Sequence, residues 1–98
     1  MFVTADPLEM GGTAGTLTAL TGQFASGNAA VAAPTTAVVP AQANETALLL
    51  SSAFGTQGSL YQALAGVAAA WHGMFAGAMG TSGASYAATE AFNVAASL

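Results

Sequence analysis

The segment that decides the fold is residues 44–80, NETALLLSSAFGTQGSLYQALAGVAAAWHGMFAGAMG. Within it, mostly apolar residues recur at alternating steps of three and four, which is the spacing of one helical stripe rather than of a strand. The members of this stripe are Leu50, Phe54, Gln57, Tyr61, Leu64, Ala68, Trp71, Phe75 and Ala78. We therefore predict a helix over about residues 44–80 with one face made for packing.

The remaining faces of this predicted helix are also apolar. They carry Leu48, Leu49, Leu60, Val67 and Met74, and no charged residue occurs between Glu45 and Glu90. A helix that is apolar nearly all round is normally buried by other protein or by lipid. We expect more burial here than a chain of this length supplies by itself.

Composition narrows the function classes. The 98 residues fit one small domain, and 54% hydrophobic with 4% charged residues excludes charged disorder. Lysine and arginine are absent and the formal net charge is -4, which disfavours nucleic acid and acidic membrane surfaces. Cysteine is absent, which removes disulfides and thiolate chemistry. The first ten residues lack the basic region of a Sec signal peptide, so we expect any export to use another route.

A first helix is predicted over about residues 7–33. In Asp6-Pro7-Leu8-Glu9 the aspartate can cap the helix, and the proline takes the first helical position, where its missing N–H costs nothing. Apolar residues then follow at three-four spacing: Leu17, Leu20, Phe24 and Val31.

The segment 34–43 contains Pro34 and Pro40 with β-branched residues between them, which favours extended backbone or a turn. Asn44 is then positioned to cap the second helix. We therefore predict an all-α fold, an antiparallel two-helix hairpin forming a single domain over residues 1–98. After Gly80, the sequence Thr81-Ser82-Gly83 is expected to end the long helix and leave a frayed tail over 81–98.

The glycine content indicates that this hairpin is marginal alone. Leaving aside Gly80 at the helix end, ten glycines fall inside the two predicted helices, and each costs about 0.8–1 kcal/mol relative to alanine. Their sum, on the order of 10 kcal/mol, is comparable to the net stability of about 5–15 kcal/mol of a whole domain. We infer that a partner completes the fold.

Neither catalysis nor a cofactor is indicated. His72 is the single histidine, three of the four acidic residues lie at predicted helix N-termini, and no nucleophile elbow or phosphate-binding loop occurs. We expect no catalytic residue, no metal site and no cofactor, and we expect His72 at an interfacial or partly exposed helix position. Residues 60–80 are long enough to cross a bilayer, but Gln62 and His72 and the absent flanking cations favour a helix packed on protein.

Several segments resemble the mycobacterial PE family. They are Phe2-Val3-Thr4, the hinge from Asn28 to Pro40 with its Ala-Ala-Pro-Thr-Thr and Val-Val-Pro sequences, Tyr61-Gln62-Ala63-Leu64, His72-Gly73-Met74-Phe75, and Ser85 to Ala91. The resemblance runs the length of the chain and is closest to short, domain-only PE proteins. The Pro-Glu pair that names the family is split here into Pro7-Leu8-Glu9.

The resemblance implies a non-catalytic protein that pairs lengthwise with a PPE-family protein in a four-helix bundle. It implies export by a type VII secretion system, with chaperone contact through the PPE subunit, from the cytoplasm to the cell-envelope surface or medium. Tyr86 and Glu90 match the family's Tyr-x-x-x-Asp/Glu secretion signal. We assign partner binding to ten apolar residues: Leu17, Leu20, Phe24, Val31, Leu50, Phe54, Tyr61, Leu64, Trp71 and Phe75.

Two alternatives stay open from the residues alone. The chain could be a membrane-active or channel-forming envelope protein, which would partition into lipid without a partner. It could instead be a self-assembling helical bundle, which would form a discrete homo-oligomer in dilute buffer.

Overall fold

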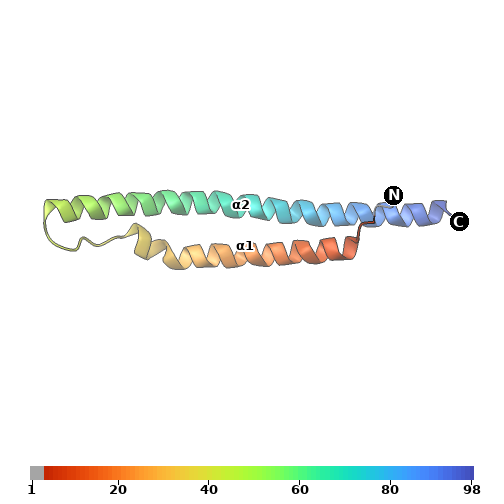
Figure 1. The fold of residues 1–98 in the computed structure, drawn as a ribbon, viewed down its shortest axis with the longest axis horizontal. Helices are drawn as coiled ribbons and strands as arrows, with labels where there is room; N and C mark the ends of the chain where they lie inside the picture. Colours follow the sequence, from red (N-terminus) through yellow and green to blue (C-terminus); the bar gives the residue numbers. More distant parts are fainter. Residues whose placement is uncertain (1–3) are drawn as a thin grey trace. The chain divides into compact units, whose positions relative to one another are not determined.

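The computed structural model describes residues 4–98 and contains two α-helices, α1 (Pro7–Thr36) and α2 (Glu45–Ala96), which form a hairpin (Figure 1). Of the family-like start, Phe2 and Val3 lie outside the described residues. The contacts divide the chain into two compact units. The terminal unit combines Met1–Thr21 with Trp71–Leu98, and the hinge unit is Gly22–Ala70. Each unit contains a segment of α1 antiparallel to a segment of α2, which confirms the predicted all-α hairpin.

Both predicted helix starts are confirmed by their caps. The Asp6 carboxylate accepts hydrogen bonds from the backbone N–H groups of Leu8 and Glu9 at 2.9 and 3.1 Å, and α1 begins at Pro7. The Asn44 side-chain oxygen accepts from the N–H of Ala47 at 2.8 Å. These bonds satisfy N–H groups that a helix start otherwise leaves unpaired.

Helix α1 extends past the predicted end at residue 33 and includes Pro34 in its last turn. A proline this close to the end removes little of the hydrogen-bond ladder, which continues with Ala37 N–H donating to the Ala33 carbonyl at 2.9 Å. The hydroxyls of Thr35 and Thr36 donate to carbonyls one turn earlier, at 2.6 and 2.7 Å, and so need no partner outside the helix. The connecting segment is therefore shorter than the predicted 34–43.

The expected break at Thr81-Ser82-Gly83 does not occur, and α2 continues to Ala96. The Thr81 hydroxyl donates to the Gly77 carbonyl at 3.0 Å. Gly83 is buried in the terminal unit, where an added Cβ would lie 3.2 Å from both the Met10 Cβ and the Pro7 carbonyl oxygen. Packing against the start of α1 thus selects a glycine inside a helix. The segment predicted as a frayed tail is the last third of α2.

The side of α2 that packs on α1 consists mostly of small residues. Its least exposed positions again alternate by three and four, and we call them the intrachain seam. They are Ser51, Gly55, Gly58, Gln62, Ala65, Ala69, His72, Ala76, Met79 and Gly83. Only Ala65 and Ala76, at 7% and 4% exposed, are buried apolar side chains within the described residues. Small residues allow the helix backbones to approach closely, but they bury little apolar area.

Two polar pairs cross the seam, one in each unit. In the hinge unit the Gln62 amide donates to the Asn28 carbonyl at 3.2 Å. In the terminal unit Thr21 and His72 hydrogen-bond through the threonine hydroxyl and Nδ1. Because the Thr21 hydroxyl also donates to the Leu17 carbonyl at 2.9 Å, its oxygen is left to accept from Nδ1–H. His72 is half-buried at this interface between α1 and α2, as its helical position predicted.

Candidate partner-binding surface

Nine of the ten side chains assigned to partner binding are exposed, and the tenth, Leu17, is half-buried. The most exposed are Trp71 at 69% and Leu64 at 67%. Isolated exposed apolar residues are ordinary, but a set of large ones repeating along one helix is a feature of interaction surfaces.

The geometry of α2 explains why these side chains are exposed. Each residue of the stripe predicted from spacing directly precedes a residue of the intrachain seam, as Phe54 precedes Gly55 and Leu64 precedes Ala65. One residue corresponds to a rotation of about 100° around a helix axis. The stripe therefore lies beside the contact with α1 and faces away from the chain's own core.

The exposed apolar side chains belong to both units. In the hinge unit they come from α2 as Leu50, Phe54, Tyr61 and Leu64, and from α1 as Phe24 and Val31. In the terminal unit they are Trp71 and Phe75 from α2 and Leu20 from α1. We call these nine residues the aromatic stripe, and each unit contributes side chains from both of its helices.

Between Ser52 and Gly77 the other flank of α2 is made of small residues, whereas Leu48, which follows the half-buried Ala47, is a large exposed side chain on that flank. The residues that directly follow seam positions are Ser52, Thr56, Ser59, Ala63, Gly66, Ala70, Gly73 and Gly77. A Cβ added at Gly66, Gly73 or Gly77 would meet nothing within 4 Å. The two flanks therefore differ strongly in the apolar area that they offer, and the aromatic stripe offers far more.

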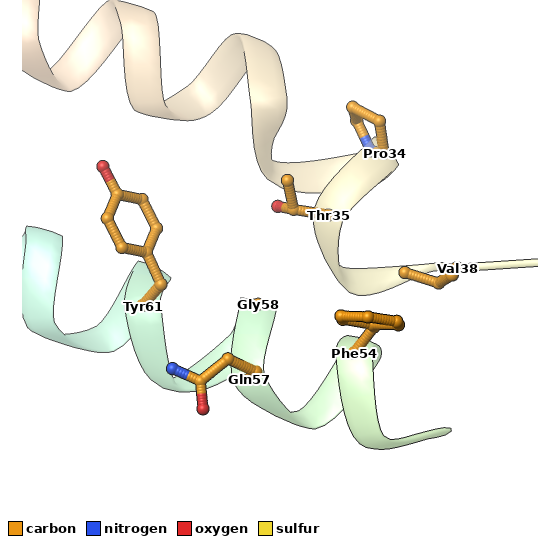
Figure 2. A pocket seen from close by; sticks show the side chains of 7 residues that line it. All are labelled: Pro34, Thr35, Val38, Phe54, Gln57, Gly58 and Tyr61. Carbon is orange, nitrogen blue, oxygen red and sulfur yellow. The ribbon is translucent and has the colours of Figure 1, made fainter. Parts of the chain in front are cut away.

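An open apolar groove lies in the hinge unit where α1 ends. It has a volume of about 430 Å³, and its lining is Pro34, Thr35, Val38, Phe54, Gln57, Gly58 and Tyr61 (Figure 2). Figure 2 shows Val38 above the Phe54 ring on one side, and the Tyr61 ring rising from α2 toward α1 on the other. Phe54 and Tyr61 belong to both the groove and the aromatic stripe.

The base of this groove is a close contact between α1 and two glycines of α2. A Cβ on Gly58 would lie 2.0 Å from the Thr35 carbonyl oxygen, and one on Gly55 would lie 2.9 Å from the Thr36 carbonyl oxygen. Real side chains do not tolerate such distances, so only glycine permits α1 to approach here. Sequence spacing did not identify this role, because glycine carries no apolar signal.

Acidic groups are the only charges available to a ligand in the described part of the chain. Asp6, Glu9 and Glu45 lie at helix starts, where the macrodipole favours a negative charge, and Glu90 lies near the end of α2. Within residues 4–98 no three metal-binding side chains gather in one place. No charged residue lies between Glu45 and Glu90, so the part of the aromatic stripe on α2 is uncharged and suits an apolar partner surface.

Tyr86 and Glu90 lie four residues apart on the final part of α2, and so on one face of a helix. They continue the three-four spacing of the seam after Gly83. Tyr86 is 47% exposed and Glu90 is exposed. Neither helix, over the residues that the structure describes, has a stretch long and apolar enough to cross a membrane.

Comparisons with known proteins agree on one protein family. The model of the PE family matches residues 3–93. PE family protein PE13 of Mycobacterium tuberculosis is 41% identical over 95 residues, which cover 97% of this chain and 96% of PE13. Two longer proteins of the same organism are also similar over 92 residues, or 94% of this chain. Ubiquitin-binding protein Rv1468c is 40% identical with 25% of its length covered, and PE family protein PE8 is 37% identical with 34% covered.

Proposed function

The chain belongs to the PE family of mycobacteria, and from this premise we propose that it is a non-catalytic protein that forms a heterodimer with a PPE-family protein. The observation that supports the proposal is the aromatic stripe, which the chain leaves uncovered. In the proposed complex, two helices of the PPE protein pack on this stripe and complete a four-helix bundle. Leu17, which is half-buried, would join the interface.

The amount of exposed surface supports an obligate partner. The chain exposes 7146 Å². A compact monomer of its mass, 9.4 kDa, would expose about 5,000 Å². This excess of about 2,100 Å² is surface that an obligate interface, which buries about 2,000–5,000 Å² counted over both partners, would cover at least in part.

Adjacent residues of α2 provide a matched test of the stripe. Leu64 belongs to the aromatic stripe, and Ala63 lies on the small-residue flank. With a PPE protein of the same genome co-expressed, Leu64→Glu should abolish co-purification because it would bury an unpaired charge. Ala63→Glu should leave co-purification intact. The reverse pattern would place the partner on the small-residue flank and refute the assignment.

The same proposal gives Tyr86 and Glu90 the role of the secretion signal. Type VII secretion would carry the heterodimer from the cytoplasm to the cell-envelope surface or medium, and a chaperone would contact the PPE subunit. The support is that both side chains lie on one face of a helix and are accessible. A rigid helix presents a phenol and a carboxylate at a fixed spacing, as a recognition signal requires.

Export and assembly can be measured separately for this signal. Tyr86→Ala and Glu90→Gln should each prevent appearance of the chain outside the cell while the heterodimer still co-purifies from the cytoplasm. Thr89→Ala is the control, since the Thr89 hydroxyl donates only to the Ser85 carbonyl of its own helix. Normal export of both signal variants would refute the assignment.

A further inference from the structure

The groove at the end of α1 has the size and lining of a binding site. Its volume of about 430 Å³ falls within the range of about 300–1,000 Å³ found for ligand pockets. Pro34 and Phe54 form stiff parts of its wall, since a proline ring is fixed and an aromatic ring has two rotatable bonds. The close contact of Thr35 with Gly58 fixes the base of the groove in the folded hairpin.

The chemistry of the lining selects an uncharged, apolar occupant. Its seven residues include no charged side chain, and the polar groups are the Thr35 hydroxyl, the Gln57 amide and the Tyr61 hydroxyl. The Thr35 hydroxyl is already used, because it donates to the Val31 carbonyl. The nearest charged residue along α2 is Glu45, two and a half turns before Phe54.

We propose that this groove is a socket for one large apolar side chain, leucine, methionine or aromatic, from a helix of the PPE partner. The inference rests on the proposed heterodimer. It adds a particular anchoring point, because Phe54 and Tyr61 place the socket directly on the aromatic stripe. A helix lying along that stripe passes the socket, and a side chain inserted there fixes the register of the two proteins. Fully desolvated anchors of this kind dominate the affinity of interfaces.

Neighbouring valines allow the socket to be filled without altering the stripe. Val38 lines the groove and is half-buried, whereas Val39 is 83% exposed and does not line it. Val38→Trp should occupy the socket and weaken binding to the PPE protein by about tenfold or more, as loss of an anchor does. Val39→Trp should bind as the unmodified chain does. Differently tagged variant and unmodified chains, co-expressed with one PPE protein, report this ratio by their shares of the heterodimer.

Each outcome has a definite meaning. Weakening by Val38→Trp alone supports the socket. Equal binding of all three chains, or equal weakening by both tryptophans, overturns the socket and leaves the heterodimer standing. Failure of the unmodified chain to bind any PPE protein overturns the proposed function and the socket with it. A homodimer of the unmodified chain that Val38→Trp disrupts would assign the socket to a second copy and overturn the proposal.

A second variant guards against misfolding of the first. Gln57→Glu keeps the size of the side chain but adds a carboxylate to the socket, which an apolar anchor would desolvate. Binding should weaken by about tenfold at neutral pH and recover as the pH falls and the carboxyl group is protonated. Gln42→Glu, in the connecting segment, is the control and should bind normally at both pH values. Gln57→Glu binding that equals the control at neutral pH would overturn the socket.

Discussion

Replacing Gly58 by alanine tests the packing of the hinge unit most sharply. The added Cβ would lie 2.0 Å from the Thr35 carbonyl oxygen and 2.7 Å from its carbon. Ordinary contacts need about 3.5 Å, so the end of α1 would have to move by about 1.5 Å. Overpacking of this kind costs about 1–3 kcal/mol, against a gain of about 1 kcal/mol in helix propensity. We expect a net loss of up to about 2 kcal/mol in the free energy of unfolding.

Gly66→Ala is the matched control in the same helix and unit. A Cβ there meets nothing within 4 Å, so only the propensity gain of about 1 kcal/mol remains. We would follow thermal unfolding by circular dichroism in trimethylamine N-oxide, which favours the folded chain. The midpoint temperature should fall for Gly58→Ala and rise for Gly66→Ala. Each shift should be about 4–8 °C per kcal/mol. An upward shift for both variants would refute the close contact between α1 and α2.

Two further substitutions test the other stabilising contacts by the same measurement. Asn44→Ala removes the cap of α2 and should lower the free energy of unfolding by about 0.5–2 kcal/mol. The control is Gln23→Ala, at an exposed position of α1, which should change unfolding little; equal effects would contradict the cap. Thr21→Val removes the hydrogen-bond partner of His72 Nδ1 and should lower the free energy of unfolding by about 1 kcal/mol. Thr18→Val is the control and should lower it less, because the Thr18 hydroxyl donates to the Ala14 carbonyl within α1. Unchanged unfolding of Thr21→Val would show that the pair does not stabilise the hairpin.

Local signals in the sequence predicted the two helices and their starts. Asp6 and Asn44 act within three residues of themselves, so no knowledge of the tertiary fold was needed to place them. The helix ends were harder, because tertiary packing overrides local preference there. Gly83 breaks helices in isolation, yet it is helical where α1 packs against it.

The side of α2 that faces α1 could not be predicted from apolar spacing. Small residues such as Gly58 and Ala65 form the seam because they let the backbones approach, while the large side chains beside them are exposed. The seam residues and the large exposed residues of α2 follow the same spacing of three and four, because each large residue directly precedes a seam residue. Spacing alone therefore cannot decide which of the two sets faces α1. Only the structure distinguishes the contact within the chain from the exposed aromatic stripe.

The central claim is that another protein must cover the aromatic stripe. The most direct test is circular dichroism with light scattering on the purified chain alone, at two concentrations and without detergent. We predict a poorly helical or aggregated chain that becomes a fully helical one-to-one complex when a PPE protein is co-expressed. A stable, fully helical monomer at both concentrations would contradict the claim, because the exposed stripe would then need no partner.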